Sequence, residues 1–158
     1  MRKKWPIGLG VFIADRASKL AAQTLLPSMP SGSFALIPGV IHLTYAQNTG
    51  IAFSILPLPS WTLALLTLAV LALATLAIRR WVPQNAWSET LLWTLLGGGL
   101  GNCADRLIYG FVIDFIEFRF VRFAIFNVAD IAITCSCAGL ALLTLLEGEE
   151  HAKNTRKS

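Results

Sequence analysis

Charged residues are scarce in this chain. Asp, Glu, Lys and Arg make up 14% of its 158 residues, whereas a soluble domain typically carries about 25%. Apolar residues make up 55%, and no charged residue occurs from 27 to 60. This composition argues against an ordinary soluble domain and predicts a single membrane-embedded domain over residues 1–158.

Residues that carry common metal or nucleophile chemistry are also few. Three cysteines are present, all in apolar segments, and the odd number argues against a disulfide framework. Neither His-Glu-x-x-His nor Gly-x-Ser-x-Gly occurs. These absences argue against a zinc peptidase and a serine hydrolase.

Four apolar segments approach the roughly 20 residues that a helix needs to cross a bilayer. We expect transmembrane helices over about 6–26, 61–78, 88–105 and 124–146, and a disordered tail over about 148–158. Gly97 and Gly101 form a Gly-x-x-x-Gly face, which allows close helix packing. The first segment also resembles a cleavable signal peptide. Asp15 and Lys19 instead favour an attached helix, because their spacing and order suit an ion pair facing the bundle interior.

The basic residues predict the orientation, since cytoplasmic loops carry an excess of Lys and Arg. They gather at the amino terminus, at 79–80 and in the tail, away from the uncharged segment 27–60. We therefore expect both termini in the cytoplasm, although Arg106, Arg119 and Arg122 weaken the contrast. The clusters flank apolar runs rather than forming a continuous basic face, so we expect no nucleic-acid partner.

Both outer loops contain β-forming residues. Residues 34–45 are interrupted by Pro38-Gly39, and residues 111–126 are rich in Phe, Ile and Val. We expect a small extracytoplasmic sheet here, because backbone groups near lipid must be hydrogen-bonded. A short interfacial helix is expected over 48–56. The predicted fold class is an all-α polytopic membrane protein with four transmembrane helices, this small sheet and the interfacial helix.

Two similar motifs lie near the ends of the last two apolar segments. They are Asn-Cys-Ala-Asp at 102–105 and Asn-Val-Ala-Asp at 127–130. Residues three apart share a helical face, so we expect each asparagine to orient the aspartate of its own motif. Asp114 lies between the motifs in the expected strand. Three carboxylates are therefore predicted to gather at the outer rim of the bilayer.

Carboxylates placed together near hydrocarbon have a defined chemistry. Burial disfavours their charged form, and two neighbours share one proton, so that one acts as an acid and the other as a base. Such a pair suits hydrolysis of a peptide bond by an activated water. In the alternative, these aspartates cap helices or pair with arginines. Both roles stay open for Asp105, which Arg106 follows directly.

Five motifs in order resemble the lipoprotein signal peptidases, the type II signal peptidases of bacteria. They are Asp15 with Lys19, Asn-Thr-Gly-Ile-Ala-Phe at 48–53, Gly-Gly-Leu-Gly-Asn-Cys-Ala-Asp-Arg at 98–106, Val-Ile-Asp-Phe at 112–115 and Phe-Asn-Val-Ala-Asp at 126–130. The resemblance implies an aspartyl endopeptidase of the bacterial cytoplasmic (inner) membrane, with no metal or organic cofactor. It implies that a diacylglyceryl-modified prolipoprotein is cut just before its lipidated cysteine.

By motif position, the resemblance implies that Asp114 and Asp130 are the catalytic pair, near the outer face of the membrane. The residues that it implies support the site or bind substrate are Asp15, Lys19, Asn48, Gly50, Asn102, Asp105, Arg106, Asn127 and Ala129. We expect membrane lipid and the prolipoprotein to be the partners, and the protein to be a monomer.

Two other classes of protein compete with this interpretation. A metal-dependent membrane lipid transferase of the CDP-alcohol phosphotransferase type shares Gly110-x-x-x-Asp114, but Phe118 stands where its next aspartate belongs. A small proton-coupled transporter also uses buried aspartates as proton relays. Transport favours charges near the middle of the membrane and often an inverted repeat, and no repeat is visible in this sequence.

Overall fold

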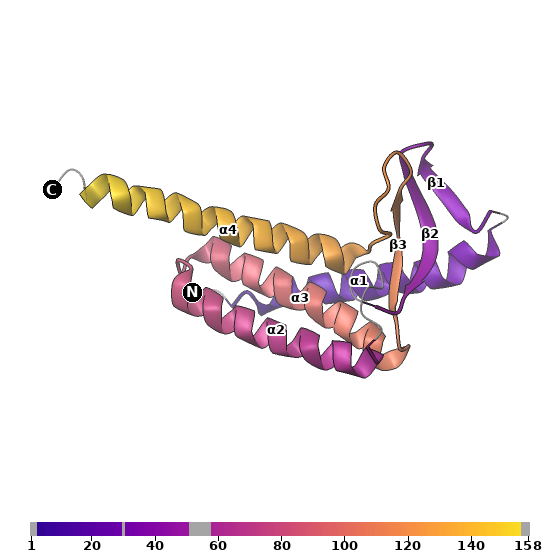
Figure 1. The fold of residues 1–158 in the computed structure, drawn as a ribbon, viewed down its shortest axis with the longest axis horizontal. Coiled ribbons are helices and arrows are strands. Elements are labelled where there is room, and N and C mark those ends of the chain that lie inside the picture. Colours follow the sequence, from indigo (N-terminus) through magenta and orange to yellow (C-terminus); the bar gives the residue numbers. More distant parts are fainter. Residues whose placement is uncertain (1–2, 30, 51–57, 156–158) are drawn as a thin grey trace.

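The computed structural model of the protein describes residues 3–29, 31–50 and 58–155. Four long helices form the body of this mostly helical fold. Figure 1 shows α3 between α2 and α4, and α3 contacts each of the other three helices. The helices are α1 (Trp5–Leu25), α2 (Ser60–Trp81), α3 (Ala86–Ile108) and α4 (Val128–Thr155).

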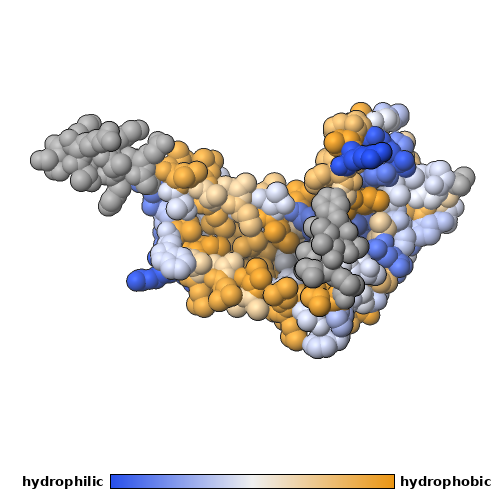
Figure 2. Space-filling view, viewed as in Figure 1, coloured by the Kyte–Doolittle hydropathy of each residue, from blue (hydrophilic) through white to orange (hydrophobic). Residues whose placement is uncertain are grey.

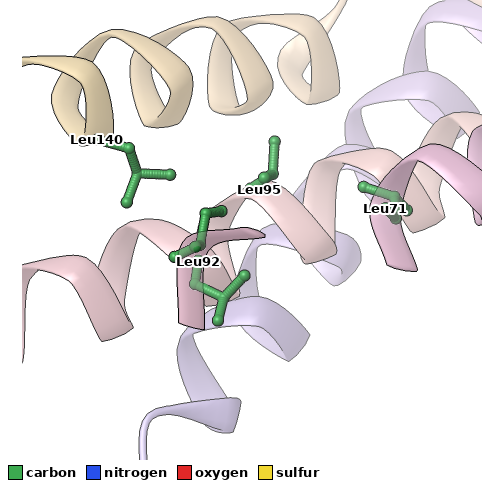
Figure 3. Close-up of a cluster of buried hydrophobic side chains, with 5 residues drawn as sticks. Leu71, Leu92, Leu95 and Leu140 are labelled. Carbon is green, nitrogen blue, oxygen red and sulfur yellow. The ribbon is translucent and has the colours of Figure 1, made fainter. Parts of the chain in front are cut away.

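A cluster of leucines holds α2, α3 and α4 together. Leu71 comes from α2, Leu92 and Leu95 from α3, and Leu140 from α4 (Figure 3). All four side chains are buried. Close packing of this kind is the main source of helix association in lipid, where hydrophobic burial between helices contributes little. The cluster therefore fixes the central position of α3.

Glycines allow α1 and α3 to approach closely. A Cβ atom added at Gly97 would collide with the carbonyl oxygen of Gly8, and one at Gly101 would collide with the carboxylate of Asp15. A Cβ added at Gly98 would lie 2.8 Å from the carbonyl oxygen of Ala129 in α4. The close packing predicted for the Gly-x-x-x-Gly face is thus confirmed, and it brings polar groups of α1 against α3.

A three-stranded antiparallel sheet stands at one end of the bundle (Figure 1). The strands lie in the order β1 (Ser33–Ile37), β2 (Ile41–Asn48) and β3 (Val112–Phe118), after the short 3₁₀ helix η1 (Leu26–Ser28). Gly39 turns between β1 and β2 with a φ of 73°, which only glycine adopts easily. The predicted small sheet is confirmed. The range predicted for the interfacial helix, 48–56, begins at Asn48, which is the last residue of β2, and residues 51–56 of it lie outside the described residues.

The bounds of α4 differ from the prediction at both ends. The helix begins at Val128 rather than near 124, because Phe126 is held in the sheet by backbone hydrogen bonds with Ile116 of 2.8 and 3.1 Å. The predicted disordered tail is also wrong as far as Thr155, where the helix ends. This stretch contains Glu, Ala and Lys, which favour helix over coil.

Apolar surface covers much of the helical body on the face shown in Figure 2, and hydrophilic residues gather near the sheet. Among the described residues, α2 and the Val128–Glu147 part of α4 are long and apolar enough to cross a membrane. The helices α1 and α3 carry buried polar residues, including Asp15, Lys19 and Asn102, which reduce their apolar content. The four membrane crossings expected from the sequence remain a prediction.

Candidate active site

The chain order brings three aspartates to the sheet end of the bundle. The strand β3 follows the end of α3 directly, and α4 begins shortly after β3. Asp105 lies in the last turn of α3, Asp114 lies in β3, and Asp130 lies in the first turn of α4. Figure 1 shows the end of α3, the strand β3 and the start of α4 at the same end of the bundle.

A groove of about 490 Å³ opens between α3, α4 and the sheet. Asp114 and Asp130 both line it, whereas Asp105 does not. Other polar residues of its lining include Asn48, Asn102, Arg106 and Thr134. Among the described residues, no group of three or more His, Cys, Asp and Glu side chains is placed to hold a metal ion.

Asp114 is almost fully buried, with 3% of its surface exposed. The pKa of this carboxyl is raised from 3.8 to about 6, chiefly by burial and in part by the charge of Asp130. Two amide donors act in the opposite direction, since they favour the charged form. Asn48 donates to Oδ2 at 3.0 Å, and Asn127 donates to Oδ1 at 2.6 Å.

Asp130 is held from two sides. The Nδ2 atom of Asn102 donates to its Oδ1 at 2.7 Å, and the backbone N–H of Asn127 donates to its Oδ2 at 3.2 Å. In return, the backbone N–H of Asp130 donates to Oδ1 of Asn127 at 3.0 Å, which caps the start of α4. The guanidinium of Arg106 is close enough to interact electrostatically with both Asp130 and Asp114.

Asn102 does not orient the aspartate of its own motif, whereas Asn127 contacts Asp130 of its own motif through its backbone N–H and its side-chain oxygen. Asn102 donates its amide to Asp130 of the other motif, and Asn127 donates its amide to Asp114 of β3. The Asn102-to-Asp105 part of the prediction is therefore wrong. The reason is that Asp105 turns toward α1, where cations are available.

A charged cluster lies behind the groove, between α1 and α3. Lys19 is fully buried and forms ion pairs of 2.9 Å with both Asp15 and Asp105. Arg16 also pairs with Asp105, whose Oδ2 accepts the backbone N–H of Ile113 at 3.2 Å. The predicted Asp15–Lys19 pair is thus confirmed. Asp105 pairs with Arg16 and Lys19 rather than with its neighbour in sequence.

Three further residues predicted for the site form hydrogen bonds that join neighbouring segments of the chain. Gly50 donates its N–H to Oδ1 of Asn48 at 3.1 Å, which leaves the Asn48 amino group directed at Asp114. Ala129 is fully buried and donates its N–H to Oδ1 of Asp15 at 3.0 Å. Arg106 reaches the carbonyl oxygen of Gly50 at 3.5 Å. These contacts join β2, α3 and the start of α4.

Apolar residues form the rest of the groove. The rings of Phe118 and Phe126 lie 5.1 Å apart, and Phe123 packs beside them. The groove continues along α4 past Thr134 and Cys135, which sequence reasoning did not identify. For Thr134, the spacing from Asp130 was the available signal, because residues four positions apart lie on one helical face. Arg16 was also missed, although it follows Asp15 in an otherwise apolar segment.

The fold is shared with solved structures of bacterial membrane enzymes. Two solved structures described as bacterial membrane enzymes, obtained by the in meso method at 2.3 and 1.9 Å resolution, are similar to this chain. The first has a TM-score of 0.77 and 28% identity, and covers 92% of this chain and 88% of its own. The second has a TM-score of 0.75 and 28% identity, and covers 90% of this chain and 96% of its own.

Sequence comparison identifies the family. The sequence model of signal peptidase (SPase) II matches residues 7–146. A lipoprotein signal peptidase of Syntrophomonas wolfei is 41% identical over 151 residues, which cover 95% of this chain and 97% of that protein. Another from Thermosynechococcus vestitus is 39% identical over 130 residues, which cover 82% of each chain. The chain belongs to the signal peptidase II family, as its motifs indicated.

Proposed function

We propose that this protein is an intramembrane aspartyl endopeptidase that removes the signal peptide from diacylglyceryl-modified prolipoproteins. Membership of the signal peptidase II family and relatives named lipoprotein signal peptidase support peptide-bond cleavage in such substrates. One observation supports the aspartyl chemistry above all others. Asp114 and Asp130 line the same groove, and amide donors from other elements hold each of them.

The two aspartates divide the proton transfers of hydrolysis between them. Asp114, whose pKa is raised to about 6 by burial, holds the proton and acts as the acid. Asp130 takes a proton from water, and the resulting hydroxide attacks the carbonyl carbon before the lipidated cysteine. Asp114 protonates the carbonyl oxygen. When the C–N bond breaks, the proton on Asp130 passes to the leaving amine and one hydroxyl of the intermediate returns a proton to Asp114, so that Asp114 and Asp130 recover their starting states and water is divided between a new carboxyl group and a new amine.

Arg106 provides fixed positive charge beside the reacting groups. It lines the groove and interacts electrostatically with both aspartates. A preorganised cation in a site that excludes water stabilises negative charge as it develops on the carbonyl oxygen. We therefore assign Arg106 a supporting role in stabilising the tetrahedral intermediate.

The arrangement of the helices supports a membrane-embedded site. The basic pair Arg79 and Arg80 ends α2 at the opposite end of the bundle from Asp114. In the proposed topology all four helices cross the inner membrane, both termini lie in the cytoplasm, and the sheet end lies at the outer face. We further propose that the protein acts as a monomer. A lipidated substrate that stays in the bilayer would reach the groove from the membrane plane.

The test uses purified protein with a diacylglyceryl-modified precursor and the same precursor without the lipid. We expect efficient cleavage of the modified precursor alone, with a product that begins at the lipidated cysteine. Asp114→Asn and Asp130→Asn should each abolish cleavage. The matched control is Glu89→Gln, because Glu89 lies at the far end of α3, beside Arg79 at 4.0 Å, and its loss should leave activity unchanged.

Three outcomes would contradict the proposal. Equal cleavage of both precursors would show that the lipid is not recognised. Loss of cleavage on adding a chelator would contradict a metal-free aspartyl mechanism. Absence of cleavage together with proton flux across vesicles would favour a transporter.

A further inference from the structure

A chain of hydrogen bonds connects α1 to both proposed catalytic carboxylates. The ammonium of Lys19 donates to Oδ1 of Asn102 at 2.8 Å, and the amino group of Asn102 donates to Asp130 at 2.7 Å. The amino group of Asn127 donates to the same Oδ1 of Asn102 at 3.1 Å and to Asp114 at 2.6 Å. Both carboxylates are therefore linked to Lys19 through two amides that share one oxygen atom.

The ammonium group of Lys19 fixes the donor-to-acceptor direction of this series of hydrogen bonds. An ammonium group only donates hydrogen bonds, whereas the asparagine amide presents an acceptor at one end and donors at the other. Contact with Lys19 requires that Asn102 turn its oxygen toward α1, which leaves its amino group for Asp130. If the amide were turned over, its amino group would face the ammonium and its oxygen would face the carboxylate.

The orientation of the second amide depends on the first. The Asn102 oxygen accepts from both Lys19 and Asn127, so a reversed Asn102 would present an amino group to the amino group of Asn127. Asn127 donates from that same amino group to the carbonyl oxygen of Ile113 at 3.3 Å and to Asp114. The correct orientation of Asn102 therefore supports the donor that faces Asp114.

We propose that Lys19 is a positioning residue for the Asp114–Asp130 pair: it fixes the orientation of both amides so that each carboxylate faces an amide donor. This inference rests on the proposed function, and Lys19 acts through Asn102 and Asn127 without contacting substrate. The role differs from helix packing. A residue that only joined α1 to α3 would leave the proton affinity of the catalytic pair unchanged.

The charged groups around Lys19 differ from those that face the catalytic pair. Its ammonium is paired with Asp15 of α1 and Asp105 of α3, and Arg16 of α1 pairs with Asp105 as well. The charged groups that face the catalytic pair are the two aspartates themselves and Arg106 of α3. Asn48 of β2, which also faces Asp114, is uncharged. The Lys19 charge additionally lowers the pKa of Asp114, so the effects of charge and of amide orientation have to be measured separately.

Lys19→Met alone would leave two buried carboxylates without their ammonium, which is strongly destabilising. The experiment therefore uses an Asp15→Asn background, in which removing Lys19 also removes the matching negative charge. Three proteins are compared: Asp15→Asn alone, Asp15→Asn/Lys19→Met and Asp15→Asn/Lys19→Gln. Met and Gln have similar length and no charge, but only Gln has an N–H donor for Asn102. For each protein, kcat, KM and the pH profile of kcat/KM are measured per unit of folded enzyme.

We expect the Met variant to lose about ten- to a hundred-fold in kcat relative to Asp15→Asn, the rate equivalent of one hydrogen bond to a charged group, with little change in KM. Its pH profile should move to higher pH, because the carboxylates lose fixed donors. The Gln variant should recover part of kcat. An unchanged kcat and profile in the Met variant would overturn the inference, and so would equal impairment of Met and Gln, which would assign the effect to charge alone.

The same assay separates this inference from the proposed function. Asp114→Asn and Asp130→Asn are included with the wild type. Cleavage by either of them would contradict the aspartyl mechanism itself. Wild-type cleavage that disappears in both, combined with an unchanged profile in the Met variant, would contradict only the role of Lys19.

Discussion

Asp114→Asn is expected to stabilise the folded protein while it abolishes activity. The Asp114 carboxyl is 3% exposed, and burial holds its pKa at about 6 instead of 3.8. The folded chain therefore disfavours the ionised form. Asparagine has nearly the same size and shape and carries no charge, so it removes this penalty.

The size of the effect follows from the pKa of Asp114. A displacement from 3.8 to about 6 corresponds to about 3 kcal/mol of free energy of unfolding, once the pH is above both values. The asparagine variant loses part of this gain in the free energy of unfolding, because one hydrogen bond to the side chain at 114 is lost. Asn48 and Asn127 both point amino groups at the carboxylate, and the amide at 114 can accept from only one of them with its single oxygen. Losing the other hydrogen bond costs about 1–2 kcal/mol, which leaves a net stabilisation of about 1–2 kcal/mol.

The stabilisation depends on pH in a defined direction. Because the pKa of Asp114 is raised on folding, the folded chain binds this proton more tightly than the unfolded chain. The stability that the bound proton provides is complete below 3.8 and is lost as the pH rises through about 6. The difference between Asp114→Asn and wild type should therefore be small near pH 4 and largest above about pH 7.

Thermal unfolding in one detergent at several pH values measures this difference. At about pH 8, a net gain of 1–2 kcal/mol raises Tm by about 2–8 °C for a domain of this size. Glu89→Gln is the control, since Glu89 lies outside the site at the other end of α3. A Tm for Asp114→Asn below that of wild type at this pH, or a difference independent of pH, would refute the reasoning.

Further predictions concern the supports of the site and its pH dependence. Asp105→Asn should lower both the amount of folded protein and the activity, because Arg16 and Lys19 lose a buried partner; full stability in a heat-inactivation assay would contradict this. Gly98→Leu should separate α3 from the start of α4 and lower folded protein, since a Cβ there would lie 2.8 Å from a backbone oxygen; Gly10→Leu, with no atom near its added Cβ, is the control and should be tolerated. For the wild type, kcat/KM should fall as the pH rises above about 6, because Asp114 loses the proton that it donates; a profile that stays flat to about pH 9 would exclude the acid role.

Local sequence patterns were sufficient for much of the fold. The apolar segment after residue 60 predicted α2, and Pro38-Gly39 between β-forming residues predicted the turn between β1 and β2. The spacing of Asp15 and Lys19 predicted their ion pair, since residues four apart meet on any helix. These features depend on neighbours in the sequence, where periodicity and turn chemistry are informative.

Contacts between distant segments could not be predicted in the same way. Asn102 bonds to Asp130, 28 positions later, rather than to the aspartate of its own motif. Arg16 pairs with Asp105 across 89 positions. Several partners of suitable chemistry compete for each of these groups, and packing between helices decides among them. The start of α4 was misplaced for a related reason, because pairing with β3 keeps Phe126 extended in a segment that is apolar enough for a helix.

The central claim is that Asp114 and Asp130 act as one unit on one water molecule, and a double-mutant cycle on cleavage rates tests it most directly. The rates to be measured are those of wild type, Asp114→Asn, Asp130→Asn and the double variant, with the lipid-modified precursor and equal amounts of folded enzyme. We predict that each single substitution lowers kcat by at least about a hundred- to ten-thousand-fold, and that the double variant is no slower than the slower single variant. A double variant slowed by the product of the two single effects, or a single variant that keeps its activity, would contradict the claim.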